Sequence, residues 1–153
     1  MATYGATVRW ARAEAEDFAA GRYSRGHEWR FDGGVAVRAS SSPHVVPRWS
    51  DPAGVDPEEA LVAALASCHM LTFLHLCSRA GHVVEAYEDE AEGIMARRED
   101  RRFWIARVTL RPRIRWGSAP PSPEAEDALH QAAHEECFIA NSVRTEVVVE
   151  PRR

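Results

Sequence analysis

Apolar residues occur on every side of a predicted helix that runs from Asp56 to Gly81. Asp56 is a candidate N-cap, Pro57 suits the first helical position, and Gly81 is a typical stop. The apolar positions between these ends are Leu61, Val62, Leu65, Met70, Leu71, Phe73, Leu74 and Leu76. Because a helix that is apolar all round is buried, we expect a core helix that packs against a second subunit.

The same run approaches the length of a membrane span, which needs about 20 largely uncharged apolar residues. It is interrupted by four polar side chains, namely Ser67, His69, Thr72 and His75. Both flanks are ordinary polar sequence. We therefore expect no membrane partner for this segment.

Strand patterns dominate the sequence before the helix. The predicted segments are a strand over 2–10, a loop or short helix over 11–21, strands over 27–31 and 35–39, and a loop over 40–55. The two adjacent strands flank Asp32-Gly33-Gly34, which is a strong hairpin signal. The Ser- and Pro-rich loop is long for a compact domain, and loops of this length often carry function.

Strands also dominate after the helix, with one helix among them. The pattern predicts a strand over 83–95, period-2 alternation over 104–114, a helix over 122–137 and a strand over 143–149. Helices and antiparallel hairpins in this order indicate an α+β fold. A chain of 153 residues is long enough for one such domain with a real core, so we expect a single domain over 1–153.

Net charge and the N-terminus narrow the function classes. The formal net charge of −4 argues against a general nucleic-acid binder, which is usually basic. The first ten residues lack the basic region and apolar run of a signal peptide, so we expect a cytoplasmic protein. In a reducing compartment, cysteines are more often catalytic, metal-binding or simply buried than paired in structural disulfides.

The three cysteines differ in their setting. Cys68 lies in the middle of the first helix and Cys137 at the end of the second. An isolated free cysteine is most often a small buried hydrophobe. Cys77 fits that interpretation, and we assign it no role.

Two segments around Cys68 and Cys137 resemble a known family. The segments are D-P-E-E-A-L-V-A-A-L-A-S-C-H and H-E-E-C-F-I-A-N-S-V-R-T-E-V. They are similar to the first and second cysteine motifs of the OsmC/Ohr family, the osmotically inducible and organic-hydroperoxide-resistance proteins. In the first motif a reactive cysteine follows ten residues after a glutamate, and here Glu58 and Cys68 match. The resemblance implies an α+β fold with antiparallel sheets, a long buried central helix and an intertwined homodimer.

The resemblance also implies an activity, the thiol-dependent reduction of organic hydroperoxides and hydrogen peroxide without metal, haem or flavin. It makes Cys68 the peroxidatic nucleophile and Cys137 the resolving thiol. A cysteine oxidised by peroxide becomes a sulfenic acid, which a second thiol converts to a disulfide. A dithiol donor then reopens the disulfide by exchange, and the family implies a lipoyl-type donor.

A peroxidatic thiolate needs nearby positive charge, and two arginines resemble the family's arginine. Arg25, just before the hairpin, resembles the arginine of the Ohr branch, and Arg48 lies at a spacing similar to that of the OsmC branch. We expect Arg25, because it precedes a strand that could hold it rigidly. Glu58 would anchor the arginine by a bidentate pair, although a glutamate in the first turn of a helix also simply suits the helix dipole.

Two departures from the family pattern stand beside the cysteines. His69 replaces the more usual aromatic or aliphatic residue after Cys68, and it is either a core histidine or a group that tunes the thiol. The sequence after Cys137 differs from the Cys-Pro-Val form common in the Ohr branch. The chain therefore resembles an outlying OsmC-like subgroup.

Two other classes of function remain open at this point. His130, His134 and Cys137 stand at i, i+4 and i+7 on one helix face, a spacing that suits zinc or another divalent metal. The chain could also be a non-catalytic dimeric binding module that kept the fold and lost turnover.

The position of Glu58 leads to one further expectation. Ten residues of helix place it roughly 15 Å from Cys68, and a glutamate–arginine pair reaches only part of that distance. Either the arginine makes a long reach, or Glu58 comes from the neighbouring chain of a dimer. We expect the second arrangement, with two symmetric sites.

Overall fold

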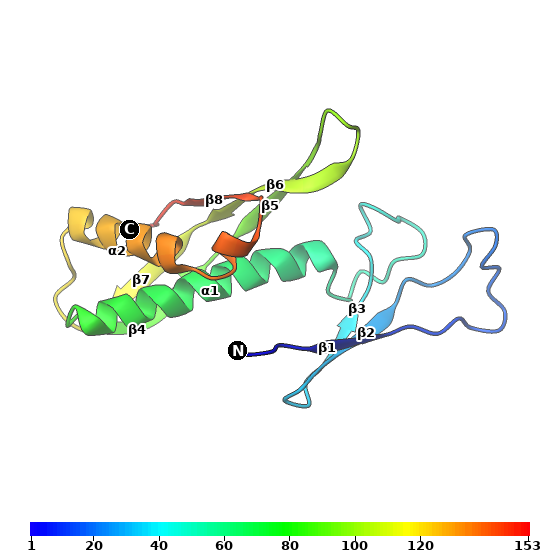
Figure 1. Cartoon of the computed structure of the whole chain (residues 1–153), viewed down its shortest axis with the longest axis horizontal. Helices are drawn as coiled ribbons and strands as arrows, with labels where there is room; N and C mark the ends of the chain where they lie inside the picture. Colours follow the sequence, from blue (N-terminus) through cyan, green and yellow to red (C-terminus); the bar gives the residue numbers. More distant parts are fainter. The chain divides into compact units, whose positions relative to one another are not determined.

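The computed structural model describes residues 1–153, and they form an α+β fold (Figure 1). The elements in order are β1 (Ala6–Arg9), β2 (His27–Phe31), β3 (Ala36–Ala39), α1 (Pro57–Arg79), β4 (Val84–Asp89), β5 (Glu92–Arg97), β6 (Phe103–Leu110), β7 (Pro112–Trp116), α2 (Pro123–Glu136), η1 (Ala140–Ser142) and β8 (Glu146–Val149). The predicted fold class is confirmed. The chain divides into two compact units, residues 1–60 and residues 61–153, and a single domain over 1–153 stays a prediction.

The first unit is built on an antiparallel sheet in the order β1-β2-β3. The predicted hairpin is confirmed: Trp29 of β2 pairs with Val8 on one side and Val37 on the other. Gly34 has a φ of 83°, a conformation that glycine adopts without a Cβ penalty. Residues 11–21 form turns and contain no helix of their own.

The predicted loop over 40–55 returns to β3 and leads into α1. Ser40 donates its backbone N–H to Val55 at 3.0 Å, and a Cβ on Gly54 would lie 2.9 Å from the Ala39 carbonyl carbon. Asp56 then starts the helix through a reciprocal pair with Glu59: the Glu59 N–H donates to the Asp56 carboxylate at 2.8 Å, and the Asp56 N–H donates to Glu59 at 3.1 Å. This is the capping-box arrangement, and it confirms the predicted N-cap.

Helix α1 is buried on one side within the chain. Its buried residues are Leu65, His69, Phe73 and Cys77. The opposite face is exposed, with Leu71 at 61%, because the sheets and α2 of the second unit cover one side only. The expected second subunit would have to cover this face. By length and composition α1 could also cross a membrane, although the core helix of a soluble protein passes the same test.

The second unit holds two small sheets, β4-β7 and β5-β6-β8. The sequence predicted one strand over 83–95 and one alternating run over 104–114, and both predictions are wrong because each run divides into two strands. The break lies where the Arg111 N–H donates to the Asp89 carboxylate at 2.6 Å instead of to a strand. Pro112, the next residue, has no N–H to donate. Strand β8 adds to β6 in parallel.

Two apolar clusters join α1 to the other elements of the second unit. Leu65 packs with Val108 and Leu110 of β6, while Phe73 and Cys77 pack with Ala133 of α2. Strand β5 approaches α1 closely at Gly93, where a Cβ would lie 2.7 Å from Val62 Cγ2. Helix α2, capped by Ser122, lies beside α1 (Figure 1).

Candidate functional site

The second unit brings Cys68 and Cys137 together. Cys68 is half-buried in the middle of α1, and Cys137 is 1% exposed at the C-terminal end of α2. Both are free, and the two side chains lie close enough for Cys68 to raise the pKa of Cys137. The pair that the sequence motifs predicted is therefore adjacent in the fold.

The pKa of the Cys137 thiol is raised, mainly by burial and further by the neighbouring Cys68. The Ala140 N–H, which donates to Cys137 Sγ at 3.4 Å, lowers this pKa and partly offsets the rise. A thiol with a raised pKa stays protonated near neutral pH and is a weak nucleophile.

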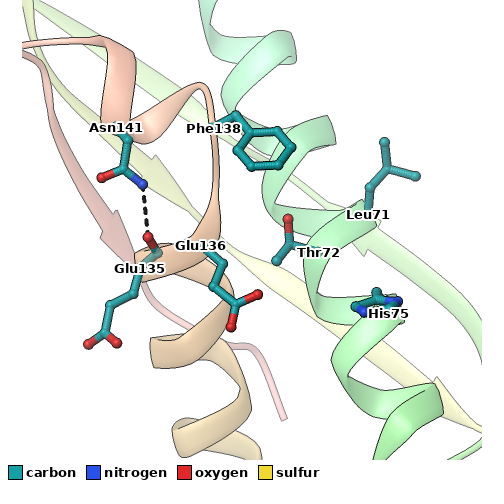
Figure 2. Close-up of a pocket in the computed structure, with 7 residues that line it drawn as sticks. All are labelled: Leu71, Thr72, His75, Glu135, Glu136, Phe138 and Asn141. Atoms are coloured by element: carbon teal, nitrogen blue, oxygen red, sulfur yellow. Dashed lines mark hydrogen bonds between the residues drawn. The ribbon is translucent and has the colours of Figure 1, made fainter. Parts of the chain in front are cut away.

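Hydrogen bonds fix the backbone on both sides of the pair. The Thr72 hydroxyl donates to the Cys68 carbonyl at 3.0 Å. After α2, the Asn141 amide donates to the Glu135 carbonyl at 2.8 Å (Figure 2) and to the Cys137 carbonyl at 3.0 Å. Side chains close in sequence to each cysteine, Thr72 and Asn141, thus stabilise the backbone at Cys68 and Cys137.

A groove of about 600 Å³ lies between α1 and the C-terminal end of α2 (Figure 2). It is lined by Leu71, Thr72, His75, Glu135, Glu136, Phe138 and Asn141. Leu71 and Phe138 make it apolar, with Phe138 at 82% exposed, and the two glutamates come from the end of α2. Sequence analysis missed this groove, because its two walls are far apart along the chain.

His69 is a core residue, as one of the two interpretations predicted. It is 1% exposed, and its Nε2 lies 3.0 Å from Nδ1 of His130, which is 3% exposed. Burial lowers the pKa of each imidazole to about 4. Both rings are therefore neutral at pH 7.

The metal site that the helix spacing left open as an alternative is not formed. His130, His134 and Cys137 do not form a group of side chains that could hold a metal ion. The His130 ring instead faces His69 and stacks on Phe73, with ring centroids 4.1 Å apart. Although the three residues share one face of α2, their side chains do not converge, because α1 fills the space beside His130.

The predicted arginine and glutamate lie in the first unit. The Arg25 guanidinium lies 3.5 Å from the Tyr23 ring centroid, and its backbone N–H donates to Trp49 at 2.8 Å. Neither Arg25 nor Arg48 forms an ion pair within the chain. One buried carboxylate oxygen of Glu58 likewise has no hydrogen-bond partner within the chain. Their roles stay predictions.

Comparisons with known proteins identify similar sequences and folds. The family model for OsmC-like proteins matches residues 50–152. An OsmC-like protein of unknown function from Vibrio cholerae is 47% identical, with a TM-score of 0.95 over 99% of this chain and 100% of that one. Among curated proteins, none matches this sequence.

Two more distant structures share the fold. The organic hydroperoxide resistance protein OhrB of Bacillus subtilis is 22% identical, with a TM-score of 0.70 over 98% of each chain. An organic hydroperoxide resistance protein from Elizabethkingia anophelis is 18% identical, with a TM-score of 0.72 over 99% of this chain and 94% of that one.

Proposed function

Because this chain belongs to the OsmC-like family, whose members include organic hydroperoxide resistance proteins, we propose that it is a cysteine-based peroxidase of the cytoplasm. Its substrates are organic hydroperoxides, and its reductant is a small dithiol of the lipoyl type. The observation that supports the proposal is the proximity of the half-buried Cys68 thiol to the buried Cys137 thiol.

The chemistry proceeds in three steps. The Cys68 thiolate attacks one peroxide oxygen, the O–O bond breaks, and the alcohol leaves with a proton, so Cys68 becomes a sulfenic acid. The Cys137 sulfur then attacks the Cys68 sulfur, a disulfide forms, and water leaves with the thiol proton. The dithiol donor reduces this disulfide by exchange and is itself oxidised to a disulfide.

The environments of the two thiols support this division of roles. Cys68 is the more accessible of the pair, and the groove begins at its neighbours Leu71 and Thr72. Cys137 is buried, and burial raises its pKa, so it is poorly suited to meet peroxide first. It needs only to reach the neighbouring sulfur of Cys68.

We assign Arg25 and Glu58 to the activation of Cys68. An arginine stabilises the thiolate, and a carboxylate orients the arginine through a bidentate pair. The unpartnered carboxylate oxygen of Glu58 suits a residue that binds a cation from another chain. The exposed face of α1, including Leu71, suits an intertwined homodimer in which the neighbouring chain supplies that partner.

Steady-state peroxide consumption tests the proposal. The purified protein is given cumene hydroperoxide or hydrogen peroxide with dihydrolipoamide or dithiothreitol, beside Cys68→Ser, Cys137→Ser and, as the matched control, Cys77→Ala. We expect turnover with cumene hydroperoxide, its loss in the first two variants, and its retention in the third. No consumption of either peroxide, with all thiols titratable, would contradict the proposal and favour a non-catalytic binding module.

A further inference from the structure

We propose that the hydrogen bond between His69 and His130 is a clamp that positions Cys68 against Cys137 for disulfide formation. Each histidine shares a helix with one cysteine: His69 follows Cys68 on α1, and His130 lies two turns before Cys137 on α2. The 3.0 Å bond between the two rings therefore ties together the two helices that carry the thiols. The role in turnover rests on the proposed function, but the clamp itself does not.

The surroundings of the two rings hold them in one geometry. The imidazole planes are 10° apart, with centroids 5.3 Å apart, and Phe73 stacks on His130 at 4.1 Å. Exposures of 1% and 3% exclude water from the pair. Neither ring can rotate away and find a replacement partner in solvent, so the bond persists as long as α1 and α2 stay packed.

The bond also makes the packing of the two helices specific. Apolar contacts alone tolerate small slides, whereas a hydrogen bond between buried rings fails when donor and acceptor separate. A slide that broke it would leave two buried ring nitrogens without a hydrogen-bond partner, which is unfavourable. The other two ring nitrogens, His69 Nδ1 and His130 Nε2, have no hydrogen-bond partner. The bond between His69 Nε2 and His130 Nδ1 is therefore the hydrogen bond that these two rings make.

Disulfide formation is sensitive to such a slide. The bond requires Cα atoms within about 7 Å and a narrow range of dihedral angles. A misplacement of 1 Å can cost a reaction roughly 100-fold. The histidines touch neither sulfur in this account, so they are positioning residues, and they should affect closure of the disulfide more than the first oxidation of Cys68.

The test is the equilibrium constant for closing the Cys68–Cys137 disulfide against a dithiothreitol redox buffer at pH 7, in the full chain. This equilibrium constant depends on how well the two thiols are aligned, and its measurement requires no peroxide. The variants are His130→Phe, which keeps a ring but loses the bond, and His130→Gln, whose amide can still bond to His69. His82→Gln, at a half-buried histidine after α1 that packs against Trp116 and not against the His69–His130 pair, is the matched control.

We expect His130→Phe to lower the closure constant about 10-fold or more, because a disulfide closed between misaligned thiols is strained and more easily reduced. His130→Gln should restore most of it, and His82→Gln should leave it unchanged. A folded His130→Phe protein that closes like the wild type would overturn the clamp, as would a His130→Gln protein that closes as poorly as His130→Phe.

A second variant covers the case in which His130→Phe does not fold. The double variant His69→Phe/His130→Phe leaves no unpaired polar group in the core, a change that can be nearly neutral for stability. We expect it to fold and still to close less well than the wild type. Wild-type closure in the double variant would overturn the clamp, whereas failure of the proposed function would appear only as absent peroxide turnover.

Discussion

The Cys137 thiol lies close to the Cys68 thiol, although one residue caps the end of α2 and the other lies in the middle of α1. This proximity depends on α2 packing along α1, which Ala133 achieves against Phe73 and Cys77. Packing in the core of the second unit thus positions the two thiols. Substitutions in that core should change how readily Cys68 and Cys137 form a disulfide.

Acid should destabilise the protein through the buried histidines. Burial lowers the pKa of His69 and His130 from 6.5 to about 4, so the unfolded chain binds more protons than the folded one between these values. The free energy of unfolding therefore falls as pH falls from about 6.5 to about 4, by at most about 3 kcal/mol for each ring. Urea unfolding at pH 7 and pH 5 measures the effect.

The matched control for this prediction is His69→Phe/His130→Phe, which should lose less stability between the two pH values. Other charged groups near the pair are His134, Asp127, Glu126 and Arg153. Burial raises the pKa of Glu126, which works in the opposite direction, and the double variant retains all four. An equal pH dependence in the two proteins would show that the histidines do not cause it.

Gly93 should be needed for the close approach of β5 to α1. In Gly93→Ala the new Cβ would lie 2.7 Å from Val62 Cγ2, and overpacking of this kind costs typically about 1–3 kcal/mol. Val62→Ala in the same protein should recover part of the loss, because it removes the clashing methyl groups. Denaturant unfolding of the single and double variants checks this, and a Gly93→Ala protein as stable as the wild type would contradict the packing.

Dimer formation should be needed for activity, with Glu58 supplied by the neighbouring chain. Mixing inactive Cys68→Ser protein with inactive Glu58→Ala protein, under conditions that exchange subunits, should restore up to one good site per heterodimer. Each variant exchanged with itself is the control. Sedimentation of a stable, active monomer would refute the dimer, and no recovery after verified exchange would place Glu58 in its own chain.

The parts of the fold that follow from local signals could be predicted from the sequence. Asp56 and Gly81 bracket α1 because a cap and a stop act within one turn of chain. The division at Asp89 could not be predicted, since it depends on a backbone N–H of Arg111 from a distant strand.

The same distinction applies to the site. The motifs around Cys68 and Cys137 marked both thiols, but spacing on one helix gave His130 the wrong role. Its partner His69 lies on the other helix, and no pattern within α2 reveals it. The all-apolar sequence of α1 predicted that a second subunit packs on this helix, but it could not show which face the sheets and α2 of the same chain leave exposed.

Cys68 should be the residue that peroxide oxidises first. In Cys137→Ser the sulfenic acid has no resolving thiol, so it should persist and react with a dimedone-type reagent. Mass spectrometry of the labelled peptides should place the adduct on Cys68. Burial raises the pKa of Cys77 to about 11, which makes it unreactive, so an adduct found there instead would overturn the assignment.

Peroxide should convert Cys68 and Cys137 into a disulfide within one chain. The direct measurement is peptide mapping after one equivalent of cumene hydroperoxide, without reductant, on the wild type and on Cys77→Ala as control. We predict a Cys68–Cys137 linkage in both proteins, reversed by dihydrolipoamide. Oxidised protein without this linkage, or with a linkage that includes Cys77, would contradict the account.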